Sequence, residues 1–593
     1  FVGASAIAVA AFWQHASTET PLAEPFKITP LTSHAGFERY SSFSPDGRHV
    51  AFSWRNDSGA PFHIHTKAIE SGSTVQRTSD HVDDLSPAWS PDGRFIAFLR
   101  SLSGEQAQLV LIPASGGPER ELTEISRPQS APSSVILFGH DRAWSPDSRF
   151  LVVPSGDPPK EPFGLLLVSI ESGATRRLLS APPGTGPYLA PAVSPDGRHL
   201  AFVRRTDFAV SEIWMNTLSG DYTPQGEPIK MTYGNRLTTS PVWAGPRELL
   251  FLSGEVGAEA GLYRMSIGQP GTPRPMPSLG EGAALLSVLA RSGSPSGPRL
   301  HVGFTRVVKD PNIYRTESSE PSTQFSASRL FSSSTRIDFN PQFSPDGRRI
   351  TFESTRSGSM EVWVANEDGS NPRQLTDFGG PLTGAARWSP DGRQIVFNSR
   401  FGGQADLYIV SANGGEPRRL TFEPTNEDLA SWSGDGRWLY FHSDRNGSSQ
   451  IWRMPADGGE WIPVTTLGGL AALESIDRKF VYYTKGKALG PASLWRVAKD
   501  GAGGGGEVPV LDSLADWSTF SVAPDGIYFI PYARSEAGSS INFYRFADGQ
   551  SRAIIEIHKP VSVGLTVSPD GRVILYTQVD RDDNDLLIAG MLR

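Results

Sequence analysis

The 593-residue chain contains no cysteine. Disulfide bonds, catalytic thiolates and zinc sites built from cysteine are therefore excluded. The sequence also has no lysine- or arginine-rich run, and its net charge is −8 at pH 7. Because nucleic-acid binding depends on a positively charged surface, we expect that this chain does not bind nucleic acid directly.

Long hydrophobic runs are scarce. Phe1–Trp13 is uncharged and apolar, but it is shorter than the roughly 20 residues that span a bilayer. We interpret this run as the end of a transmembrane helix or of a signal sequence. Residues 14–25 then form a polar linker. On this interpretation the rest of the chain is membrane-anchored on the periplasmic or extracytoplasmic side.

What the chain has in abundance is one pentapeptide, Ser-Pro-Asp-Gly-Arg. Proline presets φ, aspartate bonds nearby backbone amides, and glycine adopts the left-handed conformation, so the pentapeptide predicts a tight turn. An aromatic residue precedes most copies and an alternating apolar run follows them, which indicates a β-hairpin. Complete copies begin at Ser44, Ser90, Ser194, Ser344, Ser389 and Ser568, and degraded copies begin at Ser145, Ser433, Ser475 and Ala523.

The hairpin belongs to a longer repeat, which is clearest between Arg387 and Phe422. Four short strands are joined there by three glycine-rich turns, and such a unit of about 40–50 residues is typical of a propeller blade. The spacing of the turns gives twelve units. Because a ring holds about four to eight blades, the predicted fold is all-β, with two tandem six-bladed β-propellers made of four-stranded antiparallel blades. Their expected bounds are residues 26–316 and 327–593, with a linker at 317–326.

Two segments resemble outer strands but precede the first turn of each predicted ring, namely Phe26–Thr32 and Arg329–Ser333. We expect each ring to be closed by its own first strand, because closure removes a free sheet edge. Phe26–Thr32 would complete the blade around Leu300–Tyr314, and Arg329–Ser333 would complete the last blade. In the alternative closure, Phe26–Thr32 pairs with the C-terminal blade and threads both rings together.

The pattern from SPDGR to the outer-strand Leu-Thr resembles the TolB-type (WD40-like) propeller repeat, from Phe26 to Arg593. With the apolar N-terminal run, it also resembles bacterial membrane-anchored regulators. In those proteins a winged-helix DNA-binding domain or a serine/threonine kinase domain precedes a membrane helix and propeller repeats. The resemblance implies a sensor or protein-interaction region outside the cytoplasm, acting in signal transduction.

Two other functions stay open. One is a free periplasmic TolB-like scaffold. The other is the accessory propeller of a hydrolase that resembles prolyl oligopeptidase, whose catalytic domain carries a Gly-x-Ser-x-Gly motif. Gly293–Gly297 has proline where that serine belongs, so we expect no enzymatic activity, no catalytic residue and no cofactor.

Two motifs resemble metal sites. His63 and His65 share one face of a predicted strand but lack a third ligand. The acidic segment 580–585 lacks the glycine and the distal glutamate of a calcium loop, and we interpret it as a hairpin turn. We therefore predict no metal site.

One set of polar positions remains, six residues before the turn serine. It lies near the start of each innermost strand, where we expect the mouth of the central channel. An acidic rim would favour a basic peptide or a cation, and we expect a protein or peptide partner. The candidate residues are Glu38, Asp84, Tyr188, Thr238, Asp338, Thr383 and Glu427.

Overall fold

The structure, a computed structural model, describes most of the chain after residue 25. The described residues are 26–32, 36–56, 60–102, 106–126, 142–157, 161–182, 186–206, 209–234, 236–254, 260–267, 273–291, 299–321, 325–331, 334, 336–486, 490–499, 506–532 and 538–590. They form strands, turns and loops, and none of them is helical. The predicted membrane segment and polar linker lie outside the described residues.

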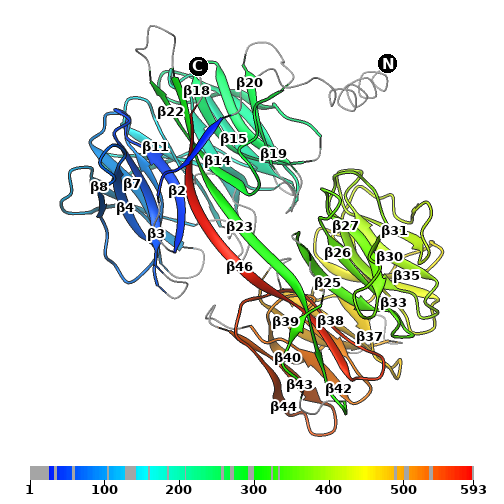
Figure 1. Ribbon diagram of the computed structural model, residues 1–593. Helices are drawn as coiled ribbons and strands as arrows, with labels where there is room; N and C mark the ends of the chain where they lie inside the picture. Colours follow the sequence, from blue (N-terminus) through cyan, green and yellow to red (C-terminus); the bar gives the residue numbers. More distant parts are fainter. Residues whose placement is uncertain are drawn as a thin grey trace, which may run out of the picture.

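Two long strands, β23 (Arg299–Glu317) and β46 (Val573–Gly590), link two groups of shorter strands (Figure 1). The strands that precede β23 are β1 (Lys27–Pro30), β2 (Phe37–Phe43), β3 (His49–Arg55), β4 (His63–Ala68), β5 (Thr74–Gln76), β6 (Asp84–Trp89), β7 (Phe95–Ser101), β8 (Gln106–Pro113), β9 (Arg120–Ser126), β10 (Ala143–Trp144), β11 (Phe150–Asp157), β12 (Glu161–Ser169), β13 (Thr175–Leu179), β14 (Tyr188–Val193), β15 (His199–Arg205), β16 (Ser211–Leu218), β17 (Pro224–Lys230), β18 (Leu237–Gly245), β19 (Glu248–Gly254), β20 (Gly261–Ser266), β21 (Arg274–Pro275) and β22 (Ala283–Arg291).

The strands that follow β23 make up the second group. They are β24 (Arg329–Leu330), β25 (Asp338–Phe343), β26 (Arg349–Ser354), β27 (Glu361–Asn366), β28 (Arg373–Gln374), β29 (Thr383–Trp388), β30 (Gln394–Ser399), β31 (Asp406–Ser411), β32 (Arg418–Arg419), β33 (Glu427–Trp432), β34 (Trp438–Ser443), β35 (Gln450–Pro455), β36 (Ile462–Pro463), β37 (Ala472–Glu474), β38 (Phe480–Gly486), β39 (Ala492–Ala498), β40 (Val508–Leu514), β41 (Phe520–Val522), β42 (Gly526–Phe529), β43 (Ser539–Arg545), β44 (Ser551–Ile557) and β45 (Val561–Val567).

Most of these strands pair in antiparallel sets of four that follow the sequence order, as the repeat predicts. Strands β6–β9, β10–β13, β25–β28, β29–β32, β33–β36, β37–β40 and β41–β44 each form such a sheet. Strands β14–β21 join two sets in one larger sheet, and β2–β5 belong to the sheet that contains β23 and β46. The fold is therefore all-β, and its units are consistent with propeller blades.

The pentapeptide turn is held by its serine and aspartate. At Ser389 the hydroxyl donates to Asp391 Oδ1 at 2.6 Å and accepts the Gln394 N–H at 2.9 Å. Gly392 has φ of +68°, a conformation that is strained for residues with a Cβ atom. In two degraded copies, Ser148 and Arg478 adopt the same conformation, with φ of +59°.

Neighbouring units are joined by the aromatic residue before the turn. The indole N–H of Trp144 donates to Ala88 O at 3.0 Å, and that of Trp432 donates to Arg387 O at 3.1 Å. In both cases the acceptor lies on the innermost strand of the preceding unit. These indoles therefore serve as links between units as well as apolar filling.

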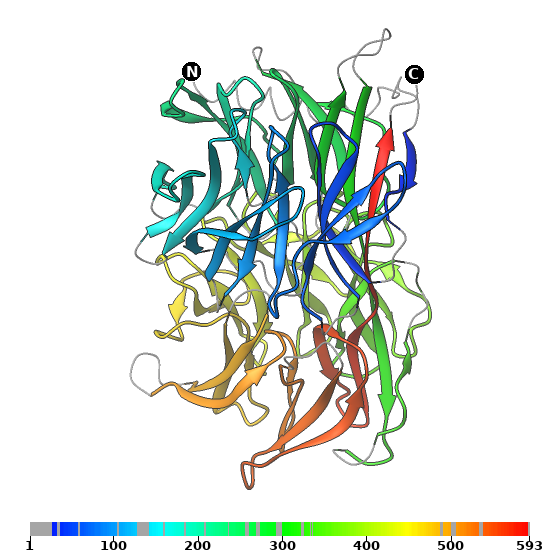
Figure 2. The ribbon, with the colours of Figure 1, turned by 90° about the vertical axis from the view of Figure 1, so that its left-hand side faces the viewer.

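The two strand groups are closed by strands that they share. The first half of β23 pairs with the second half of β46, from His301 opposite Gly590 to Asp310 opposite Arg581. The pairing continues from Pro311 opposite Val579 to Glu317 opposite Val573. Figure 2 shows the two strands running together from one group to the other. We call strands β1–β22, with residues 299–310 and 581–590, the first lobe, and strands β24–β45, with residues 311–317 and 573–579, the second lobe.

This closure differs from the favoured sequence interpretation. The segment after Ser568 was expected to form two strands separated by a turn, but Val573–Gly590 is one continuous strand. Accordingly, β1 pairs with β46 and not with β23, with Lys27 opposite Gly590. The pairing of the first strand with the C-terminal strand, and the threading through both lobes, agree with the alternative closure. In the second lobe, β24 pairs with β23, with Tyr314 opposite Leu330, in the sheet that also contains β45. The favoured interpretation, in which Arg329–Ser333 completes the last blade, is confirmed for Arg329–Leu330.

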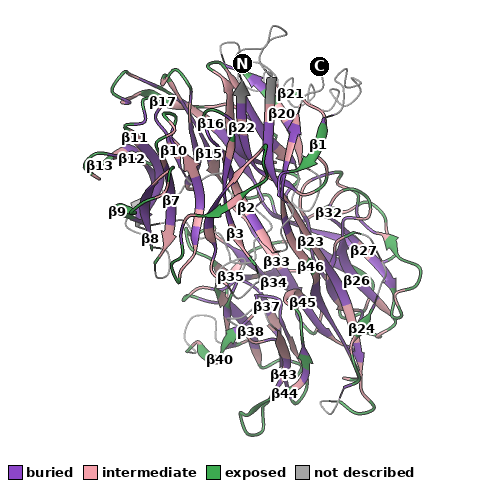
Figure 3. Cartoon of the chain, turned by 60° about the vertical axis from the view of Figure 1, so that its left-hand side comes forward, coloured by how far each residue is buried: buried purple, intermediate pink, exposed green. Residues whose placement is uncertain are grey.

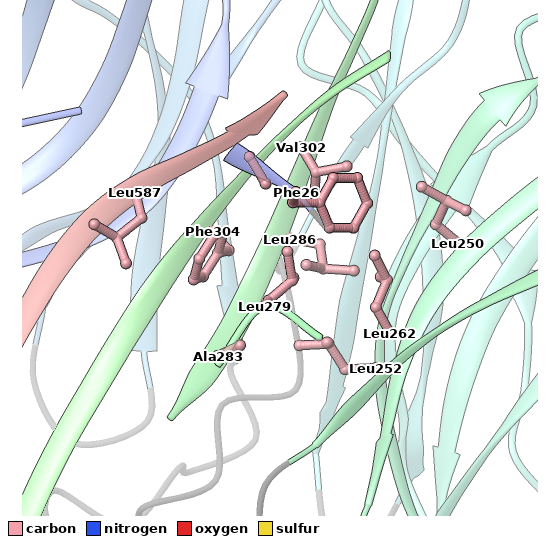
Figure 4. Close-up of a cluster of buried hydrophobic side chains, with 11 residues drawn as sticks. Phe26, Leu250, Leu252, Leu262, Leu279, Ala283, Leu286, Val302, Phe304 and Leu587 are labelled. Atoms are coloured by element: carbon pink, nitrogen blue, oxygen red, sulfur yellow. The ribbon is translucent and has the colours of Figure 1, made fainter. Parts of the chain in front are cut away.

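Both closing sheets bury apolar side chains. In the first lobe, Phe26 packs with Leu250, Val302, Phe304 and Leu587 (Figure 4), which brings together the beginning, middle and end of the chain. Figure 3 shows β23 and β46 buried over much of their length. Only the middle of the pair, residues 306–310 and 581–585, is largely half-exposed and charged.

We predict that Gly392→Ala destabilises the protein by about 1 kcal/mol, because an L-residue must adopt the left-handed conformation there. The added Cβ would meet only Pro345 Cδ at 3.8 Å, which is ordinary contact, so steric clash contributes little. Urea denaturation measures the change. The control is Gly220→Ala, where φ is outside the left-handed region and an added Cβ meets nothing within 4 Å. Equal effects of the two substitutions would contradict the prediction.

Candidate functional site

The seven residues that the sequence singled out all lie at the first or second position of an inner strand. Their side chains are buried and do not form an open rim. Their exposed fractions are 2% for Glu38, 0% for Asp84, 3% for Tyr188, 3% for Thr238, 0% for Asp338, 0% for Thr383 and 0% for Glu427.

Each carboxylate of this set is bonded within its own lobe. Asp84 accepts two bonds from Arg100, Nε to Oδ1 at 2.9 Å and Nη2 to Oδ2 at 3.1 Å. Asp338 accepts two bonds from Arg356, at 3.2 and 2.6 Å. Such bidentate pairs fix two neighbouring strands of one unit, which is a structural role. Glu38 accepts bonds from the Thr32 hydroxyl and the Leu586 N–H. Glu427 Oε1 accepts bonds from the Thr425 hydroxyl at 2.6 Å and the Ser443 hydroxyl at 3.0 Å.

The three members without a carboxylate are also engaged. Thr383 Oγ1 lies 2.9 Å from Ser399 Oγ, and Thr238 Oγ1 lies 3.1 Å from Ser253 Oγ. The ring of Tyr188 packs on Phe202 with centroids 4.6 Å apart. A role of these seven positions in ligand binding therefore stays a prediction.

The strand register places these positions in both lobes near the middle of the β23–β46 ribbon. Phe37, the first residue of β2, pairs with Asn584, and Val561, the first residue of β45, pairs with Gln578. An ion pair also joins the lobes here, from Arg336 Nη1 to Glu281 Oε1 at 3.0 Å. The inner strands of each lobe thus begin on the side that faces the other lobe.

A cavity of about 490 Å³ lies at the opposite end of the inner strands of the first lobe. Inner strands β2, β6, β10, β14, β18 and β22 contribute to its wall, close to the pentapeptide turns. The volume is in the range of ligand pockets, which hold about 300–1,000 Å³. The lining residues are Ser41, Ser42, Phe43, Ala88, Trp89, Pro91, Arg142, Ala143, Trp144, Pro146, Ala190, Pro191, Ala192, Val193, Pro195, Ser240, Pro241, Val242, Trp243, Leu286, Ser287 and Val288.

Most side chains that line this cavity are apolar or aromatic, and backbone groups, four serines and Arg142 supply polar surface. Arg142 is the one ionisable side chain among its described lining residues, and no carboxylate lines it. The guanidinium of Arg142 donates to the carbonyl oxygens of Ser86 and Leu85. The hydroxyl of Ser240 is buried and has no hydrogen-bond partner among the described residues. Such a wall suits an apolar ligand that is neutral or negatively charged and carries a hydrogen-bonding group.

Sequence reasoning missed this end of the channel. Inner strands carry a bulge in which a residue with a side chain takes the left-handed conformation, for example Ser86, Ala190 and Ser240, with φ of 55°, 46° and 53°. Register shifts mark the bulge in each case, as between Leu85 and Ala88. Such positions usually carry glycine. Because these carry serine or alanine, their residue types did not indicate the bulge. The available signal was their constant place, four residues before the turn serine.

The centre of the second lobe is filled differently. Ala385, Ala471 and Trp517 form a cluster there, with Leu429 and Val563 packed against it. Around it, side chains of the second strands accept bonds from bulge amides of the next unit. Glu353 Oε1 accepts the Ala385 N–H at 2.6 Å, and Asn398 Oδ1 accepts the Leu429 N–H at 3.3 Å.

Of these two acceptors, Glu353 carries an acidic group, and it is buried. Its Oε1 also accepts from Asn340 Nδ2 at 2.6 Å. Burial raises its pKa to about 7, and burial likewise raises the pKa of Glu427 to about 7. In the same lobe, burial lowers the pKa of His442 whereas the Asp428 carboxylate, with Oδ1 2.7 Å from Nδ1, raises it, and the net change is upward.

The two motifs that resemble metal sites both lie within strands. His63 and His65 lie in β4, and the ring of His65 packs on Trp54 with centroids 5.0 Å apart. The acidic segment 580–585 lies inside β46, not in a turn. Within the part of the chain that the structure describes, no three potential metal ligands lie together. The same described residues contain no helix that is long and apolar enough to cross a membrane.

We predict that Glu353→Gln stabilises the protein at pH 8 and changes its stability little at pH 4.5. A folded-state pKa raised to about 7 means that the native state keeps a proton that the unfolded state releases. Stability from this group is therefore present below the unfolded pKa and is lost as pH rises through the folded pKa. Glutamine removes the charge and keeps the Oε1 acceptor.

The measurement is the melting temperature of both proteins between pH 4.5 and pH 8. The control is Glu416→Gln at an exposed position. If the two curves of wild type and Glu353→Gln ran parallel across this range, Glu353 would not be the titrating group.

Two proteins of known sequence are similar to parts of this chain. The uncharacterized peptidase YuxL of Bacillus subtilis is 30% identical over 189 residues, covering 27% of this chain and 28% of YuxL. The uncharacterized protein Atu1656 of Agrobacterium fabrum is 49% identical over 37 residues, covering 6% of this chain and 13% of that protein. The chain thus matches well under two thirds of the length of either relative.

Two solved structures are similar over larger shares. TolB from Acinetobacter baumannii is 16% identical, with a TM-score of 0.26, covering 64% of this chain and 86% of that chain. The tricorn protease is 12% identical, with a TM-score of 0.29, covering 93% of this chain and 63% of that chain. Residues 373–562 match the family described as TolB beta propeller domain. This part of the chain, which runs from β28 to the start of β45, is therefore similar to a TolB-type β-propeller domain.

Proposed function

We propose that the chain is a non-enzymatic propeller module that binds a protein or peptide partner, and that the partner enters the cavity of the first lobe. The observation that carries this proposal is the convergence of six inner strands on one 490 Å³ cavity that is lined mostly by apolar and aromatic side chains. Loops and strand ends that converge on a rigid frame are common binding sites. Propellers of this general kind also often mediate protein interactions.

The proposal includes two rings of six blades, at residues 26–316 and 327–593 apart from the exchanged strands. It is supported by the neighbours of the inner strands. In the first lobe β2 contacts both β6 and β22, and in the second lobe β25 contacts both β29 and β45. First and last inner strands that touch are what a closed ring requires.

The chemistry of the cavity narrows the partner. Its described lining residues include no carboxylate, and Arg142 is the one charged group. A lysine- or arginine-rich segment would find no counter-ion there, so we propose an apolar segment that is neutral or acidic. The acidic positions at the other end of the inner strands are buried and bonded within their own lobes, so they present no exposed carboxylate to a basic peptide.

We further propose that the module is the extracytoplasmic sensor of a membrane-anchored bacterial regulator of transcription or signalling. This rests on the resemblance of the repeats and on the apolar run Phe1–Trp13. A free periplasmic scaffold would use the same cavity. The upstream sequence of the gene distinguishes the two, since a regulator needs a DNA-binding or kinase domain before the membrane helix.

A second candidate is the accessory propeller of a hydrolase. It is favoured by the partial match to a protein named as a peptidase. A hydrolysis assay with the purified chain does not decide it, because the catalytic domain would lie elsewhere. A serine-hydrolase motif in sequence that adjoins this chain would favour it over the regulator.

We predict that Val242→Trp abolishes partner binding. Val242 lines the cavity, and an indole there fills space that the partner needs. The assay is fluorescence anisotropy of labelled peptide libraries with apolar-neutral, apolar-acidic and apolar-basic members, and the first two sets should bind. The matched control is Val75→Trp, at a site on β5 that is 48% exposed, and it should bind as wild type does.

Two results would overturn the proposal. Binding that survives Val242→Trp but is lost in Glu38→Ala or Asp84→Ala would move the site to the opposite mouth. A preference for basic peptides would contradict the charge argument.

A further inference from the structure

The wall of the first-lobe cavity touches the shared ribbon directly. Ser41 Oγ lies 2.8 Å from Ser287 Oγ, and both residues line the cavity. Ser287 is paired across the sheet with Gly303 of β23. A Cβ added at Gly303 would come within 2.6 Å of Ser287 Oγ and within 2.9 Å of the Phe43 ring. The ribbon therefore packs against the cavity wall with no space to spare.

The same ribbon reaches the centre of the second lobe. Thr577 of β46 accepts the Asn340 N–H at 3.3 Å. Asn340 donates through Nδ2 to Glu353, and Glu353 accepts the Ala385 N–H. Ala385 belongs to the apolar cluster that fills this centre. A continuous series of contacts thus joins the first cavity to the second centre.

Between the lobes, side-chain contacts hold β23 and β46 together at both ends of the connecting segment. Asp580 accepts bonds from Tyr314 at 2.7 Å, Gln578 at 3.0 Å and Asn312 at 3.1 Å, on the side of the second lobe. On the side of the first lobe, Arg306 and Asp585 form an ion pair at 2.6 Å. Only a few residues of each strand lie between these two sets of contacts, so the connection between the lobes is short.

The closing sheet of each lobe contains strands that the other lobe also holds. In each of these sheets β23 and β46 are neighbours at the centre, flanked by β22 and β1 in the first lobe and by β45 and β24 in the second. The folded second lobe holds the two strands side by side, although residues 318–572 separate them in sequence. If that lobe unfolded, the first lobe could close only by ordering a loop of that length, which is costly in entropy.

We propose that the two lobes form one cooperative unit, so that a ligand in the first-lobe cavity stabilises the second lobe as strongly as the first. The statement about the ligand rests on the proposed function, whereas the cooperativity depends on the shared strands alone. Binding to the native state shifts every equilibrium that destroys this state by the same factor. In such a unit, a ligand bound in the first-lobe cavity also makes opening of the second lobe rarer.

The test uses two matched substitutions, Ile213→Val in the first lobe and Ile451→Val in the second. Both isoleucines are 0% exposed. Both occupy the same place in the repeat, since each donates its N–H to the threonine that follows the outer strand, Thr232 or Thr465, at 2.9 Å. Hydrogen exchange of the full chain, read by mass spectrometry, follows the slowest peptides of residues 84–126 and 383–463.

A cooperative unit gives the same change in both regions. Each substitution should speed exchange by about two- to twelve-fold in the lobe that carries it and by an equal factor in the other lobe. Val75→Ala, at an exposed site, should change neither. Faster exchange confined to the substituted lobe, in either variant, would overturn the proposal.

The measurement needs no ligand, so it separates the two proposals. Equal changes in both lobes together with binding that survives Val242→Trp would keep the cooperativity and discard the cavity as the binding site. Changes confined to the substituted lobe, together with binding that is lost in Val242→Trp, would keep the cavity as the binding site and discard the cooperativity.

Discussion

The antiparallel pairing of β23 with β46 is the constraint on which the rest of the structure depends. It runs from His301 opposite Gly590 to Glu317 opposite Val573, and the partners of the pair change halfway along it. Backbone groups of a buried strand must be bonded, and here each half is bonded by the other long strand and by a short strand of its own lobe. One ladder therefore removes the open sheet edge of two lobes at once.

The charged middle of this pair follows from the same geometry. Between the lobes the two strands have no apolar layer on either face, so residues 581–583 and 307–310 are half-exposed or exposed. Charged residues such as Arg581, Asp582 and Asp583 are suited to this solvent-exposed part of a strand, and they would be equally suited to an exposed turn. A two-stranded ribbon with charged side chains also resists pairing with other chains, because water competes for its edges.

The local structure of the chain could be predicted from its sequence because it depends on residues that are close together. The turn at Ser389 needs only Asp391 and Gly392, and the four-strand repeat follows from it. The closure could not be chosen in this way, because Lys27 and Gly590 are at opposite ends of the chain. The segment 580–585 was interpreted as a turn because polar residues are equally suited to a turn and to an exposed ribbon. Only the long-range pairing separates these two states.

The candidate site could be predicted from the sequence only in part. Polar residues such as Asp84 and Asp338 suggested an open mouth, yet each is buried against an arginine of its own unit. The cavity, in contrast, is lined by alanine, valine, proline and tryptophan, which look like ordinary core residues in a sequence. Whether such residues fill a centre or surround a space depends on how many bulky side chains reach the axis, which pairwise sequence patterns do not contain.

The two lobes illustrate this point with one repeat. Two bulge positions of the first lobe, Ala190 and Ser240, are small and line a 490 Å³ space, although Tyr40 and Leu285 occupy the same place in β2 and β22. In the second lobe Trp517 reaches the same central region and packs with Ala385 and Ala471. A single indole has enough volume to fill what several small side chains leave open. The hollow centre therefore costs the first lobe apolar contacts that the second lobe keeps, and a partner that supplies those contacts would be bound most strongly in the first lobe.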